Sequence, residues 1–96
     1  MREKIKSYLG LAKKAGYLIV GSEKLDGYQK KLYLTLIDKN AGKTSKKIYQ
    51  SLVERGVSGA EIENLSELVC IENCKLVGIK NLGFSEQIKK YLNQGE

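Results

Sequence analysis

The stretch Gly16-Tyr-Leu-Ile-Val-Gly-Ser-Glu-Lys-Leu-Asp-Gly-Tyr-Gln-Lys-Lys31 decides the fold of this chain. A basic, helix-like segment ends at Gly16, and the four apolar residues from Tyr17 to Val20 predict a short, buried strand. Gly21-Ser22 then opens a second helix, which carries lysines. Because the N-terminus of a helix exposes unpaired N–H groups and a positive dipole end, this turn predicts a binding site for an anion such as a phosphate group.

Helical spacing, capping residues and apolar runs continue this pattern in both directions. Leu32 to Ile37 is the clearest strand, and its apolar content is typical of a buried central position. The predicted helices cover Arg2–Ala15, Ser22–Lys31, Thr44–Arg55, Leu65–Val69 and Ser85–Leu92, and the predicted strands cover Tyr17–Val20, Leu32–Ile37, Ala60–Ile62 and Leu76–Ile79, with Ser58-Gly59 as a turn. The predicted N-caps are Ser22, Thr44, Asn64 and Ser85, and the predicted glycine stops are Gly16 and Gly56.

The order αβαβαβαβα indicates the α/β class, with a mixed or mostly parallel sheet sandwiched between helices. The 96 residues are enough for one hydrophobic core but not for two. We therefore expect a single domain over residues 1–96.

Composition places the chain among ordinary globular proteins, with 42% apolar and 29% charged residues. No apolar run approaches the roughly 20 residues of a membrane span, and no secretory signal is visible at the N-terminus. The only two cysteines, Cys70 and Cys74, fit a reducing compartment. These features predict a cytoplasmic protein that does not contact a membrane.

The charge is strongly asymmetric along the chain. Residues 1–48 hold 12 Lys and Arg against 4 Asp and Glu, a net charge of +8, whereas residues 49–96 hold 5 against 7, a net charge of −2. This division predicts one face that attracts a polyanion such as a nucleic acid.

Several motifs that suggest catalysis or metal binding are incomplete. The segment Asn40-Ala41-Gly42-Lys43-Thr44 resembles the end of a phosphate-binding Walker loop, but the position that requires a glycine is Ile37, so Thr44 is interpreted as a helix cap. The chain lacks histidine, and Glu61 and Glu63 are expected on a solvated strand edge. No nucleophile–base pair can be assembled, which predicts a protein without catalytic residues.

The two cysteines are four residues apart, with no further ligand to complete a metal site. Cys70 lies in an apolar run and is predicted to be a core residue, whereas Cys74 is predicted in a loop, with its exposure left open. We expect no metal ion and no cofactor.

Lysines near the ends of elements are the remaining candidates for function. Lys24, Lys39 and Lys43 follow the first and second predicted strands, whose carboxyl ends can meet at one sheet edge beside the Gly21-Ser22 turn. Tyr8, Tyr28, Tyr33, Tyr49 and Tyr91 fit core or boundary packing better than a base-stacking platform.

Two segments resemble the ribosomal protein L-seven-Ae superfamily, and within it the small bacterial stand-alone members of the YlxQ type. They are Leu9-Gly-Leu-Ala-Lys-Lys-Ala-Gly16, followed by Leu18-Ile-Val-Gly21, and Val77-Gly-Ile-Lys-Asn-Leu-Gly-Phe-Ser85. The resemblance covers nearly the whole chain. It implies a three-layer αβα sandwich around a four-stranded mixed sheet, and binding to kink-turns in ribosomal or other structured RNA.

In this family the turn after the first strand reads Gly-x-Asn-Glu-x-x-Lys, and its asparagine, glutamate and lysine contact sheared guanines and phosphates. Here the same positions read Gly21-Ser22-Glu23-Lys24-Leu25-Asp26-Gly27, so only the glycine matches. A carboxylate at Glu23 accepts hydrogen bonds but cannot donate them as an amide does. The second family contact region falls on Ile71–Lys75 and carries Glu72, Asn73 and Lys75. The resemblance therefore implies RNA binding with altered specificity.

The sequence thus predicts a non-catalytic RNA-binding protein associated with ribosomal RNA, a monomer, with ribosomal proteins as further partners. The predicted RNA-binding residues are Gly21, Ser22, Glu23, Lys24, Lys31, Asp38, Lys39, Asn40, Lys43, Asn73 and Lys75. The alternative is a protein-interaction adaptor that keeps the fold and has lost RNA binding. The altered motif and the acidic stretch Glu54–Glu72 favour this alternative.

Overall fold

Four strands form one mixed sheet in the computed structural model of the protein, which describes residues 2–94. The strands are β1 (Leu18–Val20), β2 (Leu34–Asp38), β3 (Ser58–Ile62) and β4 (Leu76–Ile79), and their spatial order is β1-β4-β2-β3. β4 pairs antiparallel with both β1 and β2, and β2 pairs parallel with β3. It follows that β1, β2 and β3 all run in one direction and that β4 alone runs against them.

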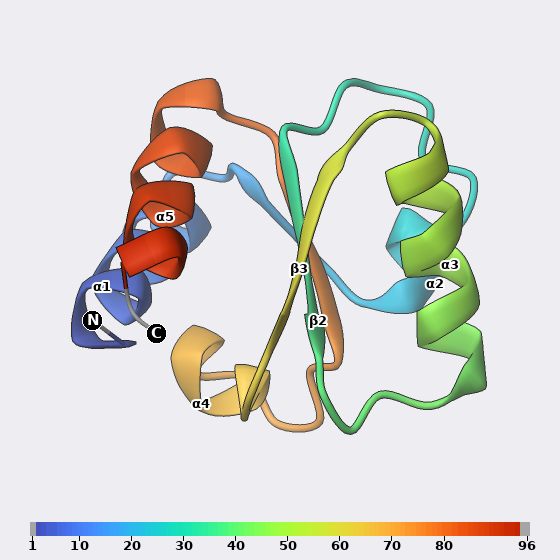
Figure 1. Cartoon of the computed structure of the whole chain (residues 1–96), viewed down its shortest axis with the longest axis horizontal. Coiled ribbons are helices and arrows are strands. Elements are labelled where there is room, and N and C mark those ends of the chain that lie inside the picture. The colour runs from blue at the N-terminus through green and yellow to red at the C-terminus, as the bar shows by residue number, and fades with distance from the viewer. Residues whose placement is uncertain (1, 95–96) are drawn as a thin grey trace.

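Five helices cover the two faces of this sheet among the described residues (Figure 1). They are α1 (Arg2–Lys14), α2 (Ser22–Leu25), α3 (Lys43–Glu54), α4 (Leu65–Val69) and α5 (Leu82–Gln94). α1, α4 and α5 lie on one face, and α2 and α3 lie on the other. Each face has its own apolar cluster, one around Leu9, Leu36 and Ile88, and one around Leu25, Ile37 and Leu52. The predicted three-layer αβα sandwich and the order αβαβαβαβα are confirmed.

The strongest local patterns in the sequence gave the right elements. The predicted apolar stripe of Ile5, Leu9 and Ala12 is buried in α1. Gly16, with φ +79°, lies in the turn that follows α1. All five residues of β2 are buried, because this central strand is covered by helices on both faces. β4 has the predicted bounds.

The second helix is much shorter than predicted. It covers Ser22–Leu25 instead of Ser22–Lys31, because Asp26 is already extended and Gly27 has φ +74°. Three of the four predicted N-caps, Ser22, Thr44 and Ser85, are also wrong, whereas Asn64 does hold the N-cap position of α4. Gly21 is the N-cap residue of α2, and Gly42 is that of α3. In α2, α3 and α4 the side chain of the N-cap residue makes no capping hydrogen bond. Asn81 caps α5 by accepting the Phe84 N–H at 3.0 Å. Ser85 instead lies inside α5 and is fully buried.

The two outer strands differ from the prediction as well. β1 is an edge strand whose three residues are only half-buried, since its outer side has no neighbour within the described sheet. β3 includes Ser58 and Gly59, which were predicted to form a turn. Gly59 lies directly beneath α3, and a Cβ built on it would lie 2.6 Å from Tyr49 Oη and 2.7 Å from Val53 Cγ2. The glycine that resembled a turn residue is needed for helix–sheet packing.

The prediction that Cys70 is a core residue is wrong, and the exposure of Cys74, which was left open, is now clear. Cys70 is exposed at the C-terminus of α4, where its backbone is left-handed (φ 57°) and its side chain leaves the core. Cys74 is buried just before β4. Burial raises the pKa of the Cys74 thiol, and the nearby charge of Asp38 raises it further, so this side chain stays protonated at neutral pH.

None of the helices between residues 2 and 94 combines the length and the apolar character needed to cross a bilayer.

The replacement Gly59→Ala tests the packing of α3 on β3. We expect a loss of about 1–3 kcal/mol in the free energy of unfolding in urea, because the added methyl group overlaps Tyr49 and Val53. Gly10→Ala is the matched control, since a Cβ at this position in α1 meets nothing within 4 Å. It should stabilise the protein by roughly 0.5–1 kcal/mol through helix propensity. Equal effects of the two changes would contradict the packing described here.

Candidate nucleic-acid interface

The direction of the strands brings most of the predicted site residues to one edge of the sheet, the one formed by the carboxyl ends of β1, β2 and β3. β1, β2 and β3 all end at this edge and β4 begins there, so the connections after β1, after β2, after β3 and before β4 are neighbours (the lower edge in Figure 1). The segments that meet are Gly21–Lys24, Asp38–Lys43, Glu63-Asn64 and Asn73–Lys75. We call this set of four segments the lower edge.

Backbone hydrogen bonds tie these segments together just beyond the strands. The Gly21 N–H donates to the Leu76 carbonyl at 3.0 Å, and the Asp38 N–H donates to the Lys75 carbonyl at 2.9 Å. The Lys39 N–H donates to the Ile62 carbonyl at 3.0 Å. These bonds join the loops of the lower edge to the sheet, so the backbone positions that carry its side chains are fixed.

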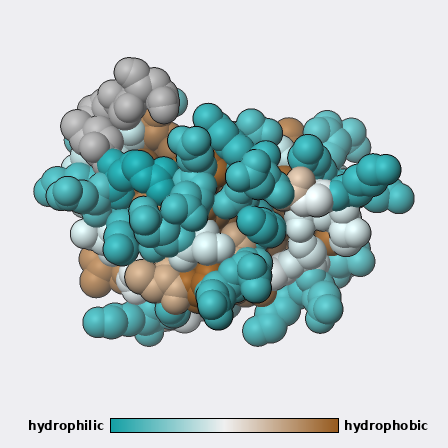
Figure 2. All heavy atoms as spheres, turned by 90° about the horizontal axis from the view of Figure 1, so that it is seen from below, coloured by the Kyte–Doolittle hydropathy of each residue, from teal (hydrophilic) through white to brown (hydrophobic). Residues whose placement is uncertain are grey.

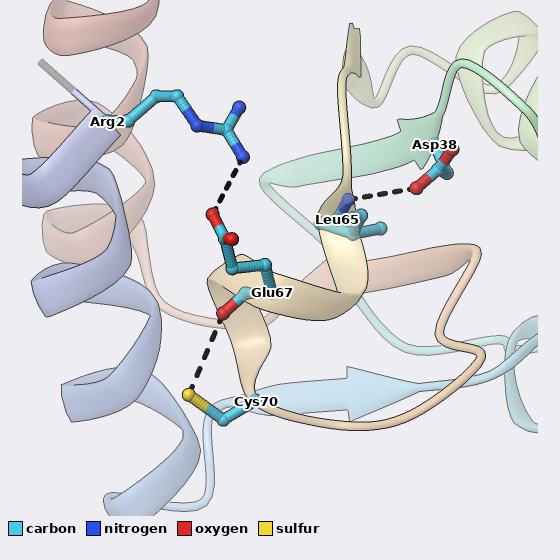
Figure 3. A network of polar contacts seen from close by, with 5 residues as sticks. All are labelled: Arg2, Asp38, Leu65, Glu67 and Cys70. Carbon is cyan, nitrogen blue, oxygen red and sulfur yellow. Dashed lines mark hydrogen bonds and ion pairs between the residues drawn. The ribbon is translucent and has the colours of Figure 1, made fainter.

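The Asp38 carboxylate fixes the lower edge more tightly still. This side chain is only 3% exposed. Its Oδ1 accepts the Asn40 N–H at 2.7 Å, and its Oδ2 accepts the Leu65 N–H at the start of α4 at 2.8 Å. Figure 3 shows the second bond, which spans 27 residues of sequence. Asp38 thus acts as the N-terminal cap of α4 that Asn64, with φ 54°, does not provide.

The ionisation of Asp38 follows from these contacts. Burial by itself raises the pKa of the carboxyl, but the two N–H donors from Asn40 and Leu65 and the positive charge of Lys75 outweigh burial and hold the pKa below its ordinary value of 3.8. The carboxylate is therefore charged at neutral pH, and both of its oxygens accept hydrogen bonds from backbone N–H groups of the protein. Asp38 was predicted to contact RNA, and its burial gives it a structural position instead.

A pair of hydroxyl groups joins the start of α2 to α3. Ser22 Oγ and Ser45 Oγ lie 2.7 Å apart. The Ser22 hydroxyl is therefore directed to a neighbouring helix rather than to the end of its own helix. This contact places the Gly21-Ser22 turn beside the first turn of α3 and its lysines.

The loop before β4 is held by one side chain of α4. Ser66 Oγ accepts the Cys74 N–H at 2.9 Å and lies 3.2 Å from the Cys74 carbonyl, to which it donates. Asn73 has a left-handed backbone (φ 57°), a conformation that asparagine tolerates better than most residues. Asn73 is exposed and Lys75 is half-buried, so both side chains stand at the surface of the lower edge.

Polar contacts on the outer side of α4 are weak. Arg2 Nη2 lies 3.6 Å from Glu67 Oε1, with both side chains largely exposed, and the Cys70 thiol approaches the Glu67 carbonyl (Figure 3). These contacts lie at the surface and do not hold the lower edge in place.

Charge along the lower edge is unevenly distributed. The side nearer α2 and α3 carries exposed lysines, namely Lys24, Lys43, Lys46 and Lys47. Lys39 is exposed as well, but it lines a hollow beside β3 together with Glu61 and Glu63. The first turn of α3 contains no acidic residue. The side nearer α4 carries the exposed carboxylates Glu63 and Glu72. Figure 2 looks at the molecule from this side, and hydrophilic residues cover most of the face.

The backbone adds donors on the same side. The first intrahelical bond of α3 is from the Lys46 N–H to the Gly42 carbonyl, so the N–H groups of Lys43, Thr44 and Ser45 precede it. The lysine side chains, the N–H groups at the start of α3 and the nearby hydroxyl groups can together bind an anion. Within residues 2–94 no cluster of three or more His, Cys, Asp or Glu side chains offers a metal site.

The structure separates one predicted residue from the others. Lys31 precedes β2 and therefore lies at the opposite edge of the sheet, where its Nζ is 5.4 Å from the centre of the Tyr33 ring. Lys31 was among the predicted RNA-binding residues, at the end of a helix that in the structure already ends at Leu25. Gly21, Ser22, Glu23, Lys24, Lys39, Asn40, Lys43, Asn73 and Lys75 do share the lower edge.

Sequence reasoning missed Ser45 and Ser66. Each hydroxyl joins two segments that are distant in the sequence, Ser45 with Ser22 and Ser66 with Cys74. Neither serine belongs to a motif. The one available signal was the position of Ser45 within a lysine-rich helix start, Lys43-Thr44-Ser45-Lys46-Lys47.

Comparison with known proteins shows the fold alone. No family model and no curated protein sequence matches the chain. Among solved structures, the chain is similar to that of a protein with unknown function from Bacillus halodurans C, with a TM-score of 0.77 and 24% sequence identity. The match covers 94% of this chain and 97% of the other.

The pH dependence of stability tests the role of Asp38. Because the folded protein lowers the pKa of this carboxyl, its contribution to stability is present above the ordinary pKa of 3.8 and is lost as the pH falls below it. We expect Asp38→Asn to lower the free energy of unfolding at pH 7 by about 1–3 kcal/mol, since one buried N–H then faces an amide NH₂ group.

The same variant should also lose less stability than the wild-type protein between pH 5 and pH 3, measured by urea unfolding at each pH. Parallel pH profiles of the two proteins would show that Asp38 does not have this role. Glu72→Gln is the control, because this exposed carboxylate has the same charge and lies at the same edge.

Proposed function

We propose that the protein binds structured RNA through the lower edge, without catalysing a reaction, and that its target is ribosomal RNA in the cytoplasm. The observation that supports this most directly is the meeting of separate basic segments at one edge of a rigid sheet. Three of the lysines, Lys24, Lys39 and Lys43, follow two different strands and are exposed on the lower edge. Such a surface suits the closely spaced phosphates of RNA.

The phosphate contacts are assigned to lysines of the lower edge and to the backbone at the start of α3. Lys24, Lys39 and Lys43 supply point charges, and the N–H groups at the start of α3 supply fixed donors with a favourable dipole. These contacts orient the RNA and contribute most of the affinity, without reading its sequence.

Base recognition is assigned to Glu23 on one side and to Asn73 on the other. Both are exposed, and they flank β1 and β4, which are neighbours in the sheet. A carboxylate at Glu23 favours a base edge that offers an amino group, whereas the Asn73 amide can donate and accept. The resemblance to the ribosomal protein L-seven-Ae superfamily supports a kink-turn-like target, and the changed residues at Glu23, Lys24 and Gly27 support a different base preference. We propose that the protein binds this target as a monomer and that ribosomal proteins are its further partners there.

The acidic side of the molecule favours a second candidate function, a protein-interaction adaptor. Glu61, Glu63, Glu67 and Glu72 are all exposed on β3, α4 and the adjoining loops. An adaptor of this kind binds a basic partner protein there and does not require the lysines near α3.

Charge reversal at the lower edge separates the two functions. We expect the double change Lys24→Glu and Lys39→Glu to weaken RNA binding at low salt by about tenfold for each lysine, since each removes a charge-assisted phosphate contact. The slope of log affinity against log salt should also fall by roughly 0.7–0.9 for each lost contact. The measurement is fluorescence anisotropy with a kink-turn RNA, an unrelated stem-loop and fragmented ribosomal RNA, titrated with salt.

Lys30→Glu with Lys80→Glu is the matched control. Both residues are exposed, both lie at the opposite edge of the sheet, and the total charge changes by the same amount. This variant should keep most of the affinity. If no RNA binds even at low salt, RNA binding is wrong, and if both variants lose affinity equally, the binding is non-specific attraction to net charge.

A further inference from the structure

A groove runs between α2 and α3 on the outer face of the sheet. Its volume is about 690 Å³, and the side chains of Leu25, Ile48 and Leu52 form an apolar floor. It adjoins α2 and the first turn of α3, which the Ser22–Ser45 hydroxyl pair joins at the lower edge. The groove is therefore continuous with the basic side of the lower edge.

The α3 wall of the groove presents polar groups at helical intervals. Thr44, Lys47, Ser51 and Arg55 all line it. They are three or four residues apart, so successive groups rise along the helix by about one turn, roughly 5.4 Å. Hydroxyl and cationic groups alternate in this row, and each can donate a hydrogen bond to a phosphate oxygen.

Arg55 closes the far end of the groove. Its Nη1 donates to the Tyr28 carbonyl at 2.7 Å, which ties the end of α3 to the segment after α2. A guanidinium group has five N–H donors, so this contact orients the side chain and leaves other donors for a ligand. Asp26 is the one carboxylate that lines the groove, against the two cations Lys47 and Arg55.

We propose that this groove holds a single-stranded segment of RNA that continues from the element bound at the lower edge. The inference rests on the proposed function and extends it by adding a second contact zone. A net positive wall with evenly spaced donors suits consecutive phosphates, and the apolar floor suits the carbon faces of riboses and bases. One strand of about three or four nucleotides matches the four donors of the row, whereas a duplex is too wide to lie between two adjacent helices.

The test compares a kink-turn stem-loop with the same stem-loop extended by five unpaired uridines at its 3′ or its 5′ end. We expect one of the two extensions to raise the affinity of the wild-type protein by about tenfold, and to steepen the salt slope by roughly 0.7 for each added phosphate contact. Lys47→Ala should remove most of this gain, measured as the ratio of the affinities for the extended and the unextended stem-loop.

Lys90→Ala is the matched control, because Lys90 is an exposed lysine on α5, in the opposite helical layer. It should keep the full gain. Two results overturn the inference while leaving the proposed function intact: neither extension improves binding to a stem-loop that does bind, or the gain survives in Lys47→Ala. Failure of every RNA to bind at low salt overturns both proposals together.

Discussion

The Asp38 carboxylate is the contact on which the lower edge depends. It sits at the end of the central strand, 3% exposed, and accepts N–H groups from Asn40 on one side and Leu65 on the other. One side chain thereby sets both the turn toward α3 and the start of α4. A neutral amide in its place leaves one of these two N–H donors without an acceptor, and such a group is costly to leave unsatisfied. A buried acid in this position makes a rigid platform without being part of the binding surface.

That platform explains how a small domain can assemble a surface from distant segments. Three strands run in one direction and β4 runs against them, so four connections meet at one edge. The proposed RNA interface follows this edge from α2 past Lys39 to the loop before β4, and the proposed groove extends it along α3. The carboxylates near α4 lie on the other side. In this account, the acidic side helps to orient a polyanion by repelling it.

Local patterns predicted the elements, and long-range contacts determined most of what was missed. Helical spacing in α1 and the apolar run of β2 depend on neighbouring residues, so the sequence showed them directly. Capping depends on which oxygen reaches the helix end, and for α4 that oxygen belongs to a residue 27 positions earlier. Cys70 was wrongly predicted to be a core residue because apolar neighbours in sequence do not show which way a side chain points. Strand direction brings the lysines that follow strands to one end of the sheet, although Lys39 lies beside β3, and Lys31, which precedes a strand, lies at the opposite end.

The most direct test of the account is a map of backbone amide chemical shifts on adding RNA to the ¹⁵N-labelled protein. We expect the largest changes at Gly21–Lys24, Lys39–Lys43 and Asn73–Lys75, with little change at Lys30, Lys31 and Lys80 on the opposite edge. The Leu65 amide, held by Asp38, should move little because the platform is already formed in the free protein. Changes concentrated at Lys30, Lys31 and Lys80, or spread evenly over all exposed lysines, would contradict the central claim that one edge of the sheet binds RNA.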